Sequence, residues 1–250
     1  MSPVLPPLVK SFKKGTQAVL DVLFPRNCLA CNGLVSEGLY RYLCPTCARR
    51  IEIIQPPCCE SCGINFEGDV QGTRLCPHCY ELTPAFSCGR TGFRLSGVGR
   101  QLIHTLKYKQ GSYLLPDIQR LVCTPLGYLE FLEGAILVPV PLHPRKERER
   151  GFNQSQLIAE WIGRSCQGVS ISNCLSRKRD TPSQTKLSRQ KRQANVRGAF
   201  MLKKGASIDT KSRYVVVDDV FTTGATLNEC CKVLRSQGAL RVDVLTLGHG

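Results

Sequence analysis

Two adjacent carboxylates, Asp218 and Asp219, end an apolar run within the stretch YVVVDDVFTTGAT at residues 214–226. The Thr/Gly-rich turn at 222–226 offers an anion backbone N–H groups, hydroxyls and the start of a helix. Gly224 lets the backbone approach a ligand closely. Carboxylates instead suit sugar hydroxyls or Mg²⁺. The stretch therefore predicts one ligand with both sugar hydroxyls and a phosphate.

Eight of the 15 cysteines form four CxxC pairs, with twelve residues between the first two pairs and thirteen between the last two. Four thiolates complete a tetrahedral zinc shell and leave no open position, so we predict one or two structural zinc ions. The repeat favours two successive zinc ribbons, although pairing across the repeats fits the spacing as well. His78, inside the last pair, is expected to be exposed rather than a ligand. The predicted ligands are Cys28, Cys31, Cys44, Cys47, Cys59, Cys62, Cys76 and Cys79.

The formal charge of +15 is concentrated in residues 141–213, which carry 17 Lys or Arg and 5 Asp or Glu, a local net charge of +12. Such a segment attracts anions, and its alternative reading is a solvated loop. No apolar run reaches the ~18 residues of a membrane span, and no signal-peptide layout is present. We therefore expect a cytoplasmic protein without a transmembrane segment, in which metal binding is favoured over disulfides.

Composition divides the chain into an N-terminal helix at 1–24, a Cys-rich zinc-ribbon module at 25–84 and a larger domain at 85–250. In the larger domain, apolar β-rich runs alternate with amphipathic helices, which predicts an α/β fold with a parallel sheet flanked by helices. Asn153 or Ser155 is the expected N-cap of the helix at 152–166. The expected strands are 135–142, 214–218 and 241–248, and the expected helices include 152–166 and 226–238.

The stretch VVVDDVFTTGAT resembles the ribose-phosphate signature of type I phosphoribosyltransferases. That resemblance implies that Asp218 and Asp219 hold the ribose hydroxyls of phosphoribosyl pyrophosphate, together with Mg²⁺. No GxxxxGK[ST] motif is present, so a Walker-type ATPase is excluded. The residues implied to hold the 5′-phosphate are Thr222, Thr223, Gly224, Ala225 and Thr226.

More of the chain resembles a narrower group, the ComF/GntX-like family. The matching stretches are the CxxC pairs, LKYK (106–109), VPVPLHPRKERERGFNQSQLIA (138–159), RDTPSQTKLSRQKRQANVRGAF (179–200) and the signature. Phe221 stands where the family usually has Val, which could narrow the pocket.

The resemblance also implies the rest of the site. His143 is the candidate catalytic residue, as a hydrogen-bond donor to pyrophosphate, and its alternative is an exposed loop histidine. A basic mobile loop at about 175–199 would close over the ligand. His104 and Lys107 lie on a helix before the sheet from which either could reach the site, but core or surface roles are favoured for both. The pyrophosphate loop comprises Pro141, Leu142, His143, Arg148 and Arg150, and the mobile-loop contacts are Arg189, Arg192, Asn195 and Arg197.

Three functions follow as expectations. The first is a phosphoribosyltransferase-like protein that binds phosphoribosyl pyrophosphate through 215–226 and acts in DNA uptake and natural transformation. Its partners would be single-stranded DNA, bound by the basic segment, and a DNA-uptake helicase or recombination protein. The second is an active phosphoribosyltransferase with an unidentified acceptor, and the third is an accessory factor of gluconate utilisation. The fold does not decide between catalysis and binding, so enzymatic activity stays open.

Overall fold

A computed structural model describes residues 26–35, 38–66, 68, 74–108, 111–123, 127–180 and 194–250. The predicted N-terminal helix at 1–24 lies outside the described residues, as do Arg189 and Arg192 of the predicted mobile loop. All four CxxC pairs and the whole of the 214–226 stretch lie within them.

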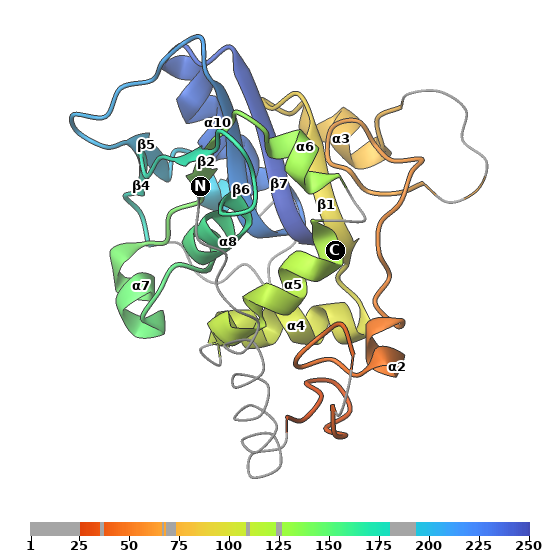
Figure 1. The fold of residues 1–250 in the computed structure, drawn as a ribbon. Coiled ribbons are helices and arrows are strands. Elements are labelled where there is room, and N and C mark those ends of the chain that lie inside the picture. Colours follow the sequence, from red (N-terminus) through yellow and green to blue (C-terminus); the bar gives the residue numbers. More distant parts are fainter. Residues whose placement is uncertain are drawn as a thin grey trace, which may run out of the picture.

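Five parallel strands form one sheet in the order β1-β7-β6-β2-β3 (Figure 1). The central strands are runs of Val, Ile and Leu because both faces of the sheet are covered. The predicted parallel α/β fold is thus confirmed. The strands are β1 (Gly89–Arg94), β2 (Ile136–Pro139), β3 (Ser170–Ile171), β6 (Arg213–Phe221) and β7 (Arg241–His249).

The two faces of the sheet build two separate hydrophobic cores. Along β6, Val215 and Val217 face the first core, whereas Tyr214 and Val216 face the second. This follows from the two-residue period of a strand. Helices α4 (Gly97–Tyr108), α5 (Leu115–Val122), α6 (Tyr128–Leu132) and α8 (Gln154–Gly163), with the 3₁₀ turn η1 (Gly111–Leu114), cover the first core.

The second core is covered by α10 (Ala225–Ser236) and by the antiparallel hairpin of β4 (Leu175–Arg177) and β5 (Phe200–Leu202). In α10 the buried side chains Leu227, Cys230, Cys231 and Leu234 follow the spacing of one helix face. The basic helix α7 (Pro144–Arg150) buries none of its residues. No helix among the described residues is long and apolar enough to span a membrane.

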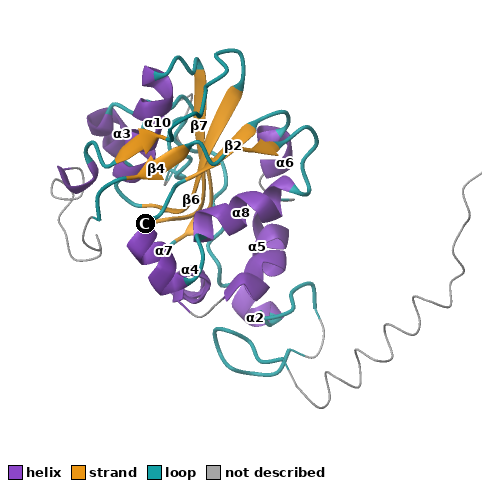
Figure 2. Ribbon diagram, turned by 90° about the vertical axis from the view of Figure 1, so that its left-hand side faces the viewer, coloured by secondary structure: helices purple, strands orange, loops and turns teal. Residues whose placement is uncertain are grey.

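The Cys-rich segment supplies one ribbon to each core. Cys28, Leu43 and Cys47 belong to the first core, together with α4 and α5. The second ribbon, which contains Cys59 and Cys62, belongs to the other core. In Figures 1 and 2, helix α2 (Pro45–Ala48) lies at the same end of the molecule as α4 and α5, whereas α3 (Pro77–Leu82) lies well away from α4 and shares the second core with α10. Each ribbon therefore completes one face of the molecule.

Candidate functional site

The paired carboxylates lie near the carboxyl end of a central strand. Strand β6 was expected to end at Asp218, but it continues to Phe221, and Asp218 pairs with Thr246 of β7. Helix α10 begins at Ala225, after Gly224 in a left-handed conformation with φ of +64°. The turn at 222–226 thus joins the carboxyl end of a parallel strand to a helix N-terminus, where α/β proteins bind their ligands.

The environment of the two carboxylates is polar and closely packed. Ser155 Oγ donates a hydrogen bond to Asp218 Oδ1 at 2.8 Å, and the Asp219 amide donates to the same oxygen at 2.9 Å. Lys107 Nζ of α4 lies 3.0 Å from Asp219 Oδ2. One cation therefore offsets part of the repulsion between two neighbouring anions.

Ser155 is placed by the cap of helix α8. Asn153 Oδ1 accepts a hydrogen bond from the Ser155 amide at 3.0 Å, while Asn153 Nδ2 donates to the carbonyl of Val140 at 3.0 Å. The cap thus fixes the start of α8 beside the end of β2. Of the two caps expected from sequence, Asn153 is the one in use, and Ser155 contacts the carboxylate instead.

Burial and the charge of Asp219 raise the pKa of Asp218 to about 7, although Lys107 and the hydrogen bond from Ser155 oppose the shift. For Lys107, burial disfavours the charge, but Asp219 and Asp218 more than compensate and raise the pKa of this ammonium. A carboxyl that titrates near neutral pH gains most from a ligand that supplies a cation or hydroxyl donors.

A pocket of about 560 Å³ opens at this edge of the sheet. Five cationic side chains line it: Arg100 and Lys107 of α4, Lys146 and Arg150 of α7, and Arg177 of β4. Burial lowers the pKa of both Lys146 and Arg177, so an anion in the pocket would stabilise their charges. The predicted site residues that line the pocket are Leu142, Arg150, Asp218, Asp219, Thr222, Thr223, Gly224, Ala225 and Thr226.

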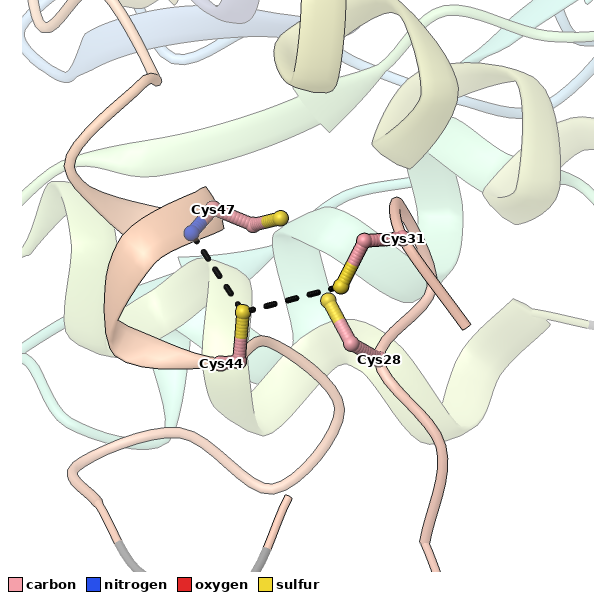
Figure 3. A group of neighbouring side chains, drawn as sticks. All are labelled: Cys28, Cys31, Cys44 and Cys47. Atoms are coloured by element: carbon pink, nitrogen blue, oxygen red, sulfur yellow. Dashed lines mark hydrogen bonds between the residues drawn. The ribbon is translucent and has the colours of Figure 1, made fainter. Parts of the chain in front are cut away.

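The eight predicted zinc ligands form two clusters of four, in the successive order of the sequence. Within each cluster the sulfur atoms lie within 4.8 Å of one another (Figure 3 for the first). Cys31 Sγ and Cys44 Sγ are 3.8 Å apart, and Cys62 Sγ and Cys76 Sγ are 3.7 Å apart. A tetrahedral ZnS₄ centre with bonds of ~2.3 Å has sulfurs about 3.8 Å apart, so both clusters fit zinc.

The comparisons with known proteins agree with this geometry. A family model described as a double zinc ribbon domain matches residues 19–81. Competence protein F of Haemophilus influenzae is 27% identical in an alignment of 241 residues that covers 90% of this chain and 98% of that protein. DNA utilization protein YhgH of Salmonella typhimurium is 32% identical in an alignment of 199 residues that covers 71% of this chain and 85% of that protein.

The chain belongs to the ComF/GntX-like family. A solved hypoxanthine phosphoribosyltransferase from Staphylococcus aureus is 16% identical and aligns with a TM-score of 0.29 over 60% of this chain and 64% of that one. The membership rests on the sequence relatives, which cover most of the chain.

Several predicted residues of this ComF/GntX-like chain lie outside the pocket lining. His143 caps helix α7, where its Nδ1 accepts a hydrogen bond from the Arg145 amide at 3.3 Å and lies 4.0 Å from Asp180 Oδ1. Arg148 is exposed on the same helix. Pro141, His143, Arg148, Asn195 and Arg197 are not among the residues that line the pocket.

Other residues reach the site without having been assigned to it. Lys107 and His104, expected in core or surface roles, both line the pocket, because α4 crosses the end of the sheet. Arg177 arrives from the β4–β5 hairpin. The residues next to a basic or hydroxyl side chain in the sequence do not show that it lines a pocket. Its position there depends on contacts between segments that are far apart in the chain.

Proposed function

We propose that this member of the ComF/GntX-like family binds phosphoribosyl pyrophosphate in the pocket at the end of β6. The single observation that carries the proposal is that Asp218, Asp219 and the turn at 222–226 line one pocket. The carboxylates suit the ribose hydroxyls, and the turn offers N–H groups and hydroxyls to the 5′-phosphate.

The cations of the pocket suit the pyrophosphate. Arg150 and Arg177 can each present several N–H donors, and Lys146 adds a point charge. Mg²⁺ would arrive with the ligand and neutralise part of its charge. Asp218 is the better candidate to face it, since Asp219 is already paired with Lys107.

A double substitution tests the proposal. Asp218→Asn with Asp219→Asn should weaken phosphoribosyl pyrophosphate binding about 100-fold or more in isothermal titration with Mg²⁺, because two charged hydrogen-bond acceptors are removed. Asp209→Asn, which changes an exposed carboxylate that does not line the pocket, is the control. Unchanged affinity in the double variant would falsify the assignment.

Whether the ligand is consumed or only bound is a separate question. If an acceptor attacks the ribose, pyrophosphate is released, and incubation with a panel of bases and amines should detect it. Release that disappears in the double Asn variant supports a transferase. Tight binding without release supports a protein that senses the ligand.

We further propose that the chain acts in DNA uptake and contacts single-stranded DNA. The names of its relatives, competence protein and DNA utilization protein, favour this role over a gluconate-linked one. Helix α7 exposes Arg145 and Arg148, and beside it Tyr108 is 60% exposed, with the Arg150 guanidinium 5.2 Å from its ring centre. Exposed cations next to an aromatic ring suit a phosphate backbone and a stacked base. The two clusters of four thiols favour a reducing compartment, which is consistent with the cytoplasm.

Salt dependence tests the DNA role. Fluorescence anisotropy of a labelled thymidine oligonucleotide should reveal binding that weakens steeply with salt. Arg148→Glu should lower the affinity and reduce the slope against log salt by about 0.7 for each phosphate that the variant no longer neutralises. Lys232→Glu, an equal charge change at an exposed position of α10, should do neither. No binding at low salt, or equal effects in both variants, contradicts the role assigned to α7.

A further inference from the structure

The second zinc ribbon touches the phosphate-binding turn directly. His78 lies between the ligands Cys76 and Cys79, and its Nε2 is 3.0 Å from the carbonyl oxygen of Thr223. A carbonyl can only accept a hydrogen bond, so Nε2 carries the proton and donates it. His78 was expected to be exposed; instead it is partly buried and joins segments 145 residues apart.

Apolar contacts complete this junction. Phe221 lies against the edge of the His78 ring, with ring centres 5.9 Å apart, and stacks on His249 at 4.9 Å. A Cβ atom at Gly224 would lie 2.5 Å from Phe221 Cζ and 2.9 Å from Leu82 Cδ2. The turn therefore rests on the ribbon helix and on Phe221 with no room for a larger residue.

A second hydrogen bond follows just after the ribbon helix. The amide of Ala85 donates to Asn228 Oδ1 at 2.7 Å, in the first turn of α10. The ribbon is thus joined both to the turn and to the helix whose N-terminus that turn precedes.

The hydrogen bond from His78 to the Thr223 carbonyl fixes the orientation of the peptide group between Thr223 and Gly224. In a trans peptide the carbonyl oxygen and the next N–H point in opposite directions. Because Thr223 directs its carbonyl to the ribbon, the Gly224 N–H points away from the ribbon. Thr223 and Gly224 both line the pocket, so this N–H is a donor suited to a bound phosphate.

The first cysteine cluster, unlike the second, lies on the face of the sheet away from the turn. It packs into the opposite core with α4 and α5, and the buried Asp117 accepts hydrogen bonds from the amides of Arg41 and Tyr42 at 2.8 and 2.7 Å. Its surroundings are thus on the other face of the sheet from the turn. The chain therefore carries an internal control for the effect of zinc on the turn.

We propose that His78 is a positioning residue for the phosphate-binding turn, and that zinc in the second cluster makes ligand binding metal-dependent. The zinc holds Cys76 and Cys79, these hold α3, and α3 presents His78 and Leu82 to the turn. The part of this inference that concerns ligand affinity rests on the proposed function, whereas the part that concerns the turn itself does not.

Hydrogen–deuterium exchange of the peptide that covers 222–226 tests the inference without any ligand. His78→Phe keeps a ring against Phe221 but removes the donor, so exchange in the turn should be about fivefold faster, the effect of removing one ordinary hydrogen bond. Phosphoribosyl pyrophosphate affinity should fall by a similar factor. His78→Gln retains an N–H donor and should restore most of both. Zinc content is measured in every variant.

The two clusters supply the second comparison. Cys62→Ser should speed exchange in the turn, and Cys31→Ser, in the first cluster, should leave it unchanged. The proposal is overturned if His78→Phe keeps its zinc and wild-type exchange, or if both cysteine variants affect the turn equally. Should the wild type fail to bind phosphoribosyl pyrophosphate, the proposed function fails, and the exchange data still decide the role of His78.

Discussion

At the scale of single residues, Asp218 is held where its charge is costly. It lies beside a second carboxylate and burial raises its pKa to about 7, far above that of an exposed aspartate. The folded chain therefore binds a proton that the unfolded chain has released between about pH 4 and pH 7. Stability is lost as the pH rises through that window. Such a loss of stability is expected at a binding site, where the ligand supplies the cation or hydroxyl donors that the carboxylate lacks in the free protein.

Asp218→Asn should therefore stabilise the free protein above neutral pH. The amide oxygen can still accept from Ser155 and from the Asp219 amide, while the costly charge is gone. We expect a gain of up to about 4 kcal/mol in the free energy of unfolding at about pH 8, which is what the difference between a pKa of about 7 and that of an ordinary aspartate corresponds to. Urea unfolding of both proteins, with zinc present, measures it.

The gain should shrink as the pH falls and reach about zero only near pH 4, where the carboxyl is neutral in the unfolded chain as well as in the folded one. Asp209→Asn serves as the control, because an exposed hydrogen bond holds the pKa of Asp209 low rather than high. An equal gain for Asp218→Asn at both pH values would show that the charge of Asp218 is not the cause.

At the scale of elements, the sequence predicted the strands of the sheet, because their apolar residues recur in a regular pattern. The expected strands at 135–142, 214–218 and 241–248 correspond to β2, β6 and β7, although β2 covers only residues 136–139 and β6 is four residues longer than expected. Adjacent carboxylates ended the apolar pattern, yet the ladder to β7 continues through Phe221. Backbone pairing with a neighbouring strand does not depend on side-chain polarity.

The site itself was predicted only where its residues are close in the chain. Asp218, Asp219 and the turn at 222–226 form one local motif and do line one pocket. Lys107 and His78 come from distant elements, and their roles depend on how α4 and α3 pack at the sheet. Neither residue has a pattern of its own, so only the folded chain reveals them.

At the scale of the whole molecule, a parallel sheet lies between two ribbons that differ in exposure. In the first cluster Cys31 is exposed and Cys44 is partly so, whereas all four cysteines of the second cluster are buried. A chelator reaches an ion through its exposed ligands. The second zinc should also be held by the packing of its ribbon beneath Phe221 and α10.

We therefore expect the full chain to bind two zinc ions and to release them to a chelator in two phases, the faster from the first cluster. Cys31→Ser should remove the fast phase and one ion, because a four-sulfur centre loses a ligand. Cys62→Ser should remove the slow phase and, through α3, weaken ligand binding. A colorimetric zinc assay separates these outcomes. A single phase in the wild type, or a fast phase that survives Cys31→Ser, would mean that the exposure of the cysteine ligands does not set the order in which the two clusters lose zinc.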